Sequence, residues 1–284
     1  SDIKHIPLLK KKELIFLQSI GPRLGGLLTK DIGELKRIFL SPGPIFDPED
    51  RMDDYWGYTE AFYSVGFRPG DVVQVTFNYH LSPAGLMFEE PLRNLGCASI
   101  PAGPTDPGTQ LDIMQKLRVS GYVGTASYLM HLAQKAEEKG INLRKDLFQE
   151  VAFVTGERLS EKMRNQLEKK FDIILRQGYG TADVGCIGYE CFHKTGLHIS
   201  NRCYVEICHP DTGIPLKDGE VGEIVVTSFN KTYPLIRLAT GDLSYIDRAP
   251  CACGRTSPRL GSIVGRVDTT ARIKGMFVYP HQVE

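Results

Sequence analysis

A repeating alternation between residues 53 and 178 constrains the fold more than any other feature of the sequence. Short apolar runs, each suited to a buried strand, are separated by stretches suited to helices. The candidate strands lie at 71–78, 97–101, 121–124, 151–155 and 172–176, and the candidate helices at 53–66, 83–95, 107–118, 126–139 and 160–170. Strands that alternate with helices of about 10–15 residues are typical of βαβ units. The sequence therefore predicts an α/β fold with a mostly parallel, helix-flanked sheet.

The two ends of the chain show other patterns. Helical patches lie near 10–18 and 31–37, and the proline-rich stretch at 41–48 is expected to be a loop. After residue 185, short alternating runs separated by turns predict antiparallel hairpins. We expect an α/β domain at 1–185, a smaller antiparallel β-rich subdomain at 186–268, and a hinge with the start of a further domain at 269–284.

Composition excludes several classes of protein. Of 284 residues, 34 are basic and 34 acidic, which argues against a nucleic-acid binder or a protein held on an anionic membrane. The longest uncharged stretches contain polar residues and do not suit a transmembrane span, and no secretory signal is visible. Seven cysteines, an odd number spread over a long chain, favour a reduced cytoplasmic protein without a disulfide framework.

A Gly-Tyr-Gly turn directly follows the candidate strand at 172–176. The carboxyl end of a parallel strand is where α/β sheets bind ligands. Tyr179 offers a flat face for a base, and Asp183 offers a carboxylate for a metal ion. The alternative is a strand-ending turn with a structural tyrosine.

A second turn, Thr240-Gly241-Asp242, presents another carboxylate. Asp242 is suited to accept two hydrogen bonds from a ribose diol, and an Asx turn before the next strand is the alternative. A third segment begins with Gly-Arg-Val-Asp at 265–268 and continues to Pro280. Taken alone, it is a basic strand, loop and strand.

Together, the order and spacing of these segments resemble the adenylate-forming, acyl-activating superfamily, and within it the phenylacetate–CoA ligase group. The segments at 179–183, 237–242, 265–268 and 274–284 resemble its Tyr-Gly-x-Ser/Thr-Glu, Arg-x-x-Thr-x-Asp, Gly-Arg-x-Asp and Lys-Gly-x-x-Val-x-Pro motifs, and 155–157 resembles its adenine-flanking Gly-Glu turn. The resemblance covers nearly the whole chain from about residue 37.

The resemblance implies a role for each matching residue. Tyr179 would stack on adenine beside Gly156 and Glu157, and Asp242 would bind the ribose hydroxyls with support from Arg266. The remaining implied positions are Gly180 and Thr181 at the nucleotide, Ser41 and Gly43 in the phosphate loop, Asp183 at the Mg²⁺-associated carboxylate, Asp268 at the hinge, and Tyr79 and His80 along the acyl pocket. A packed aromatic ring and a satisfied histidine are the alternatives for the last two.

The activity that the resemblance implies is that of an ATP-dependent acid–CoA ligase acting through an acyl-adenylate. Its cofactors would be ATP/AMP, Mg²⁺ and CoA, and its partner an aryl or small carboxylic acid; a homodimer is compatible with the resemblance. Because the family's adenylation lysine would lie beyond residue 284, we expect the chain alone to bind but hardly to turn over.

The stretch at 41–48 departs from the family's phosphate loop. It keeps Ser41, Gly43 and Pro48 but has three prolines and places Asp47 where a cation is usual. Prolines remove backbone donors that cradle phosphate. This departure favours an alternative, a non-catalytic nucleotide- or acyl-binding relative. An adenylate-forming enzyme with another acceptor is a third hypothesis.

A set of thiols and imidazoles in the second half of the chain is suited to a metal. Thiolates and a neutral imidazole in a set of four suit a closed tetrahedral zinc site. We expect Cys191, His198, Cys251 and Cys253 to be structural zinc ligands, with His193 as an alternative to His198. Scattered buried cysteines and surface histidines are the other interpretation.

Overall fold

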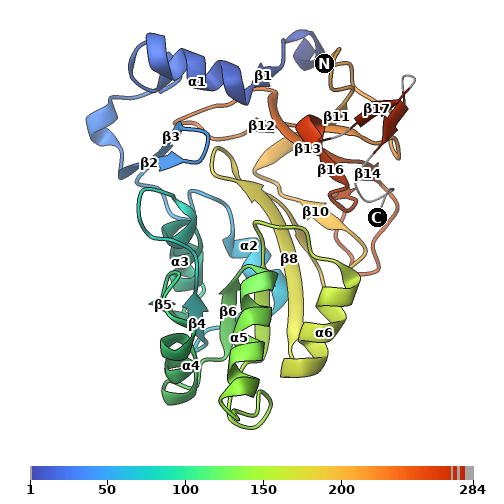
Figure 1. Cartoon of the computed structure of the whole chain (residues 1–284). Coiled ribbons are helices and arrows are strands. Elements are labelled where there is room, and N and C mark those ends of the chain that lie inside the picture. The colour runs from blue at the N-terminus through green and yellow to red at the C-terminus, as the bar shows by residue number, and fades with distance from the viewer. Residues whose placement is uncertain (1, 270, 274–275, 279–284) are drawn as a thin grey trace.

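Five parallel strands form the part of the fold that the alternating pattern predicts. The computed structural model describes residues 2–269, 271–273 and 276–278 (Figure 1). The strands lie in the order β5-β4-β6-β7-β8, and every neighbouring pair is parallel. Their bounds are Val72–Val75 for β4, Ala98–Pro101 for β5, Gly121–Gly124 for β6, Val151–Val154 for β7 and Ile174–Thr181 for β8.

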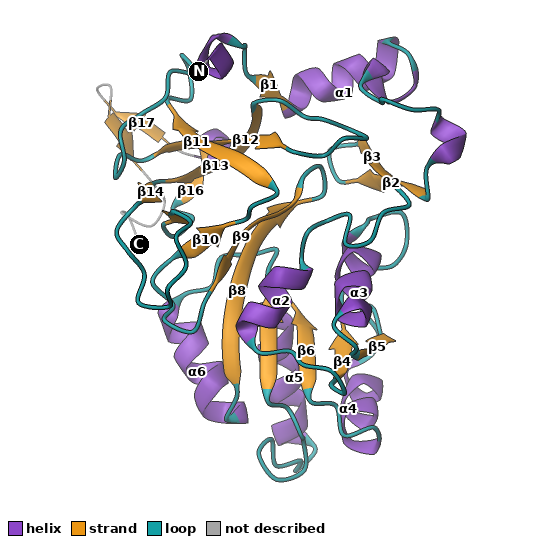
Figure 2. Ribbon diagram, turned by 180° about the vertical axis from the view of Figure 1, so that it is seen from behind, coloured by secondary structure: helices purple, strands orange, loops and turns teal. Residues whose placement is uncertain are grey.

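Helices cover both faces of this parallel sheet. Their bounds are Thr59–Val65 for α2, Ala84–Asn94 for α3, Pro107–Lys116 for α4, Ala126–Glu138 for α5 and Glu161–Phe171 for α6. α2 and α3 pack on one face in an aromatic cluster that includes Phe62, Phe88 and Phe153, whereas α4, α5 and α6 pack on the other (Figures 1 and 2). Strands buried on both faces are typical of parallel sheets, and the predicted α/β fold is confirmed.

Side-chain caps fix where three of these helices begin. Asp106, Thr125 and Ser160 each accept a hydrogen bond from the backbone N–H three residues further on. Such a cap satisfies a donor that the first turn of a helix leaves unpaired. The caps therefore set the lengths of the loops that connect β5, β6 and β7 to the helices after them.

The sheet continues beyond β8 with antiparallel strands. β9 (Gly185–Glu190) pairs with β8, β10 (Leu197–Ile199) pairs with β9, and β15 (Arg259–Leu260) and β14 (Ile246–Asp247) complete the sheet of nine strands. The predicted change to antiparallel structure near residue 185 therefore occurs inside one sheet, at the turn between β8 and β9.

A second sheet packs against these antiparallel strands. Its strands are β11 (Cys203–Cys208), β12 (Gly222–Ser228), β13 (Leu238–Ser244), β16 (Gly265–Arg266) and β1 (Leu9–Lys10). An apolar cluster that includes Ile187, Ile207 and Ile224 fills the space between the sheets. Because β1 pairs in parallel with β13, the start of the chain joins the sheet formed by its last third.

Two expectations for the first half of the chain are wrong. The stretch at 41–48 is not a loop: β2 (Arg37–Ser41) and β3 (Ile45–Glu49) form a hairpin with its turn at 42–44. Each strand of a two-stranded sheet has an outer edge, where a proline such as Pro48 is tolerated. The patch at 31–37 contains only a 3₁₀ turn before β2 begins.

The remaining elements are short, apart from one helix. α1 (Lys11–Ile20) corresponds to the helical patch predicted near 10–18. The 3₁₀ turns are Asp2–His5, Arg23–Gly26, Ile32–Glu34 and Val267–Thr269, and β17 (Ala271–Ile273) pairs with β18 (Met276–Val278). Much of the predicted motif at 274–284 lies outside the described residues. No helix in the described part of the chain has the length and apolar character needed to cross a bilayer.

Candidate functional site

The structure brings Tyr179, Asp242 and Arg266 together from three strands. The Tyr179 hydroxyl at the end of β8 donates to Oδ2 of Asp242 on β13 at 2.8 Å, and Arg266 on β16 donates from Nη1 to Oδ1 of Asp242 at 3.0 Å. The pairing of β16 with β13 sets Asp242 opposite Arg266. The phenol and the guanidinium therefore hold both oxygens of one carboxylate.

The Asp242 carboxylate keeps room for a ligand. Its side chain is 16% exposed, and an ionised carboxylate offers about four lone-pair positions, of which the two contacts above use two. Burial, followed by the Asp242 charge, raises the pKa of Tyr179 well above its ordinary value. Tyr179 therefore remains a hydrogen-bond donor to Asp242 at neutral pH.

Tight packing accounts for the glycine at 180. A Cβ added to Gly180 would lie 2.2 Å from the Tyr58 hydroxyl oxygen and 2.3 Å from the Gly185 carbonyl oxygen. The next residue closes the turn, because the Thr181 hydroxyl accepts a hydrogen bond from the Val184 N–H at 3.3 Å. The turn is thus fixed before any ligand arrives, and contact of Gly180 and Thr181 with a nucleotide stays a prediction.

The Gly156-Glu157 turn follows β7 directly. Gly156 has a φ of +84°, which favours glycine. The Glu157 carboxylate accepts hydrogen bonds from the Ser127 N–H at 2.6 Å and the Ser127 hydroxyl at 2.9 Å, at the start of α5. Glu157 therefore ties the end of β7 to a helix N-terminus, and its place beside adenine stays a prediction.

Asp183 lies buried in the turn between β8 and β9. Its side chain is 1% exposed, and its Oδ2 pairs at 2.7 Å with Nζ of Lys11, the first residue of α1. The other oxygen, Oδ1, is buried without a hydrogen-bond partner among the described residues. An unpaired buried carboxylate oxygen is costly, so the donor set suits a cation.

Asp47 on β3 lies close to Asp183. Burial, and then the neighbouring Asp183 charge, raises the pKa of Asp47 to about 8. The Ser41 hydroxyl lies near enough to lower the pKa of Asp47, but its hydrogen bond goes to the Ile45 carbonyl oxygen at 3.4 Å. Neither Asp47 oxygen has a hydrogen-bond partner of good geometry within the described ranges. Gly43, in contrast, lies exposed in the hairpin turn.

No hydrogen bond or ion pair within the described part of the chain joins the next three predicted residues to Asp47 or Asp183. Tyr79 is half-buried, and its ring packs so closely on Gly85 that a Cβ there would lie 2.6 Å from the ring. His80 is exposed. Asp268 is also exposed and accepts a hydrogen bond from Nε of Arg266 at 3.1 Å, so it extends the Tyr179–Asp242–Arg266 group. The acyl-pocket and hinge roles stay predictions.

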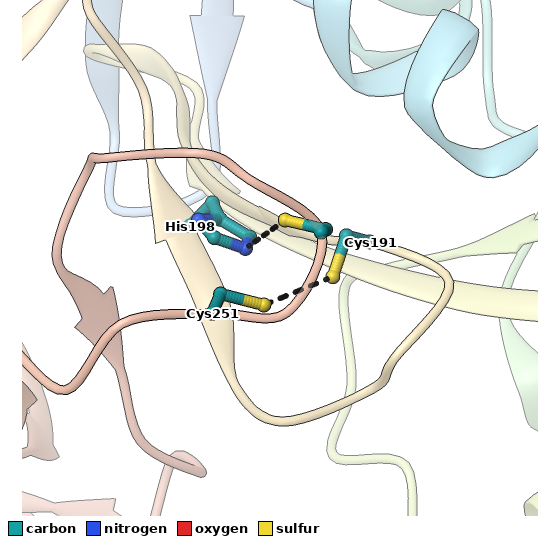
Figure 3. Close-up of side chains that lie close together, drawn as sticks. Cys191, His198 and Cys251 are labelled. Carbon is teal, nitrogen blue, oxygen red and sulfur yellow. Dashed lines mark hydrogen bonds between the residues drawn. The ribbon is translucent and has the colours of Figure 1, made fainter.

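The predicted zinc ligands converge on one point. The ligand atoms of Cys191, His198, Cys251 and Cys253 all lie within 4.8 Å of one another. Figure 3 shows Cys191 and His198 projecting from the β9–β10 region toward the loop that carries Cys251. His193, the alternative ligand, is exposed and stacks on Phe192.

The spacing within this cluster fits a tetrahedral metal site. Zn–S bonds of about 2.3 Å at a tetrahedral angle put two sulfurs about 3.8 Å apart. Cys191 Sγ and Cys251 Sγ are 3.7 Å apart, and Cys253 Sγ lies 3.4 Å from His198 Nε2. The other ring nitrogen, Nδ1, contacts the Ser257 hydroxyl at 3.2 Å, which orients the imidazole as second-sphere partners of metal ligands do.

The local environment shifts the pKa values of two thiols of this cluster in opposite directions. Burial raises the pKa of Cys191 to about 11. For Cys251, burial is outweighed by hydrogen bonds from the backbone and thiol of Cys253, and the pKa falls to about 5. A thiolate next to neighbouring ligand atoms is the form that binds metals.

The fold is that of an α/β protein with a partly exposed carboxylate at its candidate site, and comparison with known proteins identifies the class. The family model for AMP-binding enzymes matches residues 55–231, more than half of the 284 residues. The chain belongs to the AMP-binding enzyme family. This confirms the resemblance to the adenylate-forming superfamily.

Particular relatives support the resemblance to the phenylacetate–CoA ligase group. The chain is 30% identical to phenylacetate-coenzyme A ligase of Thermus thermophilus over 300 residues, which cover 100% of this chain and 65% of that relative. It is 30% identical to phenylacetate-coenzyme A ligase of Escherichia coli over 244 residues, which cover 81% and 54%. The chain therefore spans less than two thirds of the length of both relatives.

Solved structures share the fold. An open conformation of 2-hydroxyisobutyryl-CoA ligase in complex with 2-HIB-AMP and CoA aligns with a TM-score of 0.89 at 25% identity, covering 97% of this chain and 67% of that one. ATP-bound MatB from Rhodopseudomonas palustris aligns with a TM-score of 0.68 at 19% identity, covering 90% and 52%; this second likeness is one of fold alone.

Two charged neighbours of the candidate site are not among the residues that the sequence predicts. Lys11 lies 172 positions from its partner Asp183, and a lysine in a basic N-terminal run gives no sign of such a contact. Glu223 on β12 accepts a hydrogen bond from the Gly241 N–H at 3.0 Å beside Asp242. The sequence gives one sign of this contact. Glu223 lies in an apolar strand, and a buried acid there needs a hydrogen-bond donor.

Proposed function

We propose that the protein is an ATP-dependent acid–CoA ligase that acts through an acyl-adenylate. The substrate carboxylate attacks the α-phosphorus of ATP, the bond to pyrophosphate breaks, and an acyl-adenylate forms. The CoA thiol then attacks the acyl carbon, loses its proton, and releases AMP as the thioester forms. The Tyr179–Asp242–Arg266 group is the observation that carries this proposal, because it presents a fixed, partly exposed carboxylate to a ribose diol.

Each member of this group has a separate task in the proposed reaction. Asp242 accepts hydrogen bonds from the ribose hydroxyls, while Tyr179 and Arg266 keep the carboxylate oriented. A preorganised acceptor of this kind fixes the nucleotide for in-line attack, which is the main demand of such chemistry. Asp268, paired with Arg266, connects the group to the segment proposed to act as a hinge.

Asp183 and its surroundings fit Mg²⁺, the metal that the family resemblance implies. The unpartnered Oδ1 of Asp183 would be its ligand on this chain, and carboxylate oxygens are the donors that Mg²⁺ prefers. The bound ion would neutralise phosphate charge. The buried position of Asp183 limits water around that charge and so strengthens its interactions.

The acid proposed as substrate is an aryl or small carboxylic acid. The curated relatives are named for phenylacetate, and the solved neighbour of similar fold contains 2-HIB-AMP. Tyr79 and His80, after β4, are the side chains proposed to lie along the acyl group.

Acid-dependent release of pyrophosphate from ATP tests the proposed function. With Mg²⁺, a panel of aryl and small acids and then CoA, we expect pyrophosphate release to depend on the acid and a thioester to form. Carrier-protein thiols or cofactor hydroxyls in place of CoA test the other acceptors. Asp242→Asn should lower the release, whereas Asp218→Asn, an exposed aspartate paired with Arg248, should not. Release that is independent of the acid would contradict the proposal.

A second candidate function is a non-catalytic nucleotide-binding or acyl-binding protein. The β2–β3 hairpin favours it, because its turn contains two prolines and β3 buries Asp47 where the family has a cation. AMP binding without any pyrophosphate release or ATP binding would favour this second function.

We also propose one structural zinc ion at Cys191, His198, Cys251 and Cys253. The four ligands would fix the β9–β10 turn to the loop after β14, outside the chemistry. Metal analysis should give one zinc per chain for the wild type and for Cys97→Ser, a buried cysteine outside the cluster. Cys253→Ser should lose the zinc and melt at a lower temperature. A wild-type content well under one zinc per chain would rule the site out.

Compartment and assembly complete the proposal. A cluster of three thiols poised for a metal is suited to the reducing cytoplasm. A homodimer stays a prediction, and light scattering of the purified chain tests it.

A further inference from the structure

Asp47 and Asp183 form a pair of buried carboxylates that lack most of the hydrogen-bond partners they could have. Asp47 is 1% exposed and the side chain of Asp183 is also 1% exposed. Three of their four oxygens have no hydrogen-bond partner among the described residues. Buried polar atoms are nearly always paired in proteins, so three unpaired oxygens in one place indicate a missing ligand.

Several observations place the two carboxylates in one small space. Ile45 on β3 and Val184 in the β8–β9 turn pack in one apolar cluster, and the Asp183 charge raises the pKa of Asp47. The pKa of Tyr233 is raised to about 12 by burial and by both Asp47 and Asp183. Figures 1 and 2 both show the turn between β8 and β9 rising beside the β2–β3 hairpin. The hairpin that replaces the expected loop therefore delivers Asp47 to the carboxylate on the β8–β9 turn.

Lys11 is the one ammonium group bonded to this pair in the described part of the chain. Its Nζ lies 2.7 Å from Asp183, and its side chain is 35% exposed. Lys11 thus reaches from solvent over an otherwise buried carboxylate. Two ionised carboxylates and one ammonium leave a net charge of −1, which demands either a proton or a further cation.

We propose that Asp47 and Asp183 together bind one divalent, oxygen-preferring cation and that Lys11 holds Asp183 until the cation arrives. The role of that ion, as the Mg²⁺ of Mg·ATP, rests on the proposed function. The assignment of Asp47 as a second ligand goes beyond it. Hard cations such as Mg²⁺ and Mn²⁺ bind carboxylate oxygens. Asp47 lies in the segment where the family has a lysine. A carboxylate at this place attracts a cation, whereas a lysine would repel it.

The proposal also gives Lys11 a second position. When the cation takes the Asp183 oxygens, the ammonium of Lys11 is released beside the phosphates of the nucleotide. Lysine is a flexible point charge suited to such a contact. Lys11 would then supply from α1 the positive charge that the β2–β3 hairpin lacks.

Titration of the nucleotide-free chain with Mn²⁺, followed by the electron paramagnetic resonance signal of the free ion, tests the proposal. We expect one Mn²⁺ per chain, displaced by Mg²⁺. Asp47→Asn should weaken Mn²⁺ binding by at least about tenfold, since it removes one of two charged ligands. Lys11→Met should tighten binding by about threefold or more, because the competing ammonium is gone.

Two controls make the result decisive. Lys12→Met changes the neighbouring, exposed lysine and should leave Mn²⁺ affinity unaltered. Asp47→Asn should fold, because it keeps the size of the side chain and breaks no hydrogen bond, and circular dichroism checks this. The proposal would be overturned if Asp47→Asn and wild type bound Mn²⁺ with equal affinity, or if wild type bound no Mn²⁺. The role given to Lys11 would be overturned if Lys11→Met left the affinity unaltered. AMP calorimetry on the same samples reports separately on the proposed function, because AMP is proposed to bind at Asp242.

Discussion

Buried charges in this protein have two contrasting kinds of surroundings. Arg164 on α6 donates to both oxygens of Glu190 at 2.9 and 2.6 Å, and Arg237 pairs with Glu206 at 3.0 Å and also donates to backbone carbonyls of the N-terminal segment. Around Asp47 and Asp183, by contrast, three oxygens are unpaired. The first kind is complete within the fold, whereas the second leaves carboxylate oxygens without partners at the site where we propose that a cation binds.

The difference teaches where stability and function lie in this chain. Complete pairs connect elements: Arg164 ties α6 to β9, and Arg237, the residue before β13, ties the start of that strand to β11. A buried ion pair stabilises little compared with an apolar pair, but loss of one partner is costly. An incomplete pair costs stability while it is empty, which fits a binding site better than a structural one.

Breaking a complete pair should have the largest effect. Arg164→Met leaves Glu190 as a buried charge, and the free energy of unfolding should fall by about 3–5 kcal/mol. Chemical denaturation of the two proteins measures the difference. A loss below about 1 kcal/mol would mean that the pair is no more important than a surface pair.

Neutralising the incomplete pair should act in the opposite direction. The pKa of Asp47 is about 8 in the folded chain against 3.8 for the unperturbed group, so the folded state holds a proton that the unfolded chain has lost. Between these values the free energy of unfolding therefore falls as pH rises. Asp47→Asn should remove this loss, and in a chelating buffer should be more stable than wild type by about 1–3 kcal/mol at pH 8.

The pH dependence of that gain is the diagnostic. The stability difference between Asp47→Asn and wild type should shrink toward zero as pH falls to about 4. Asp183 and Lys11 are the charged neighbours, and both are unchanged in the variant. Melting curves across this range measure the difference, and a destabilised variant or a gain that is constant with pH would remove the contrast between the two kinds of surroundings.

The Tyr179–Asp242 contact is intermediate, because it is formed within the fold but lies at the proposed nucleotide site. Tyr179→Phe removes one hydrogen bond to Asp242, and AMP affinity should fall by about threefold to tenfold. Calorimetry measures it. An AMP affinity equal to that of wild type would assign the hydroxyl to folding alone.

An exposed pair should give the smallest effect. Arg248 and Asp218 are 60% and 52% exposed, so solvent screens their attraction. Arg248→Met should change the free energy of unfolding by no more than about 1 kcal/mol, as denaturation will show. A larger change would mean that exposure does not separate the pairs in this protein.

Local patterns in the sequence predict much of this architecture. The alternation of apolar runs and helical stretches predicts β4 to β8 and their helices, because the pattern that marks each strand or helix lies within a few consecutive residues. The predicted zinc ligands can also be found from the sequence, because cysteines and a histidine in a set of four are typical of a metal site. They are Cys191, His198, Cys251 and Cys253.

Contacts between distant segments are not visible in such patterns. The β2–β3 hairpin is hidden by its prolines, which the open edges of a two-stranded sheet tolerate. The pairing of β1 with β13 joins residues more than 200 positions apart, and the contact of Lys11 with Asp183 depends on it. Neither leaves a periodic trace. The sequence therefore marks Asp183 as a metal carboxylate, but its association with Asp47 and Lys11 could be recognised only from the folded chain.

Calorimetric titration with AMP tests the central claim most directly, since AMP is proposed to bind at the Tyr179–Asp242–Arg266 group. We predict that wild type and Asp218→Asn bind AMP with the same affinity, and that Asp242→Asn binds about tenfold or more weakly, the equivalent of about 1.4 kcal/mol or more. Equal affinity of Asp242→Asn and wild type, or no AMP binding by wild type, would contradict the account.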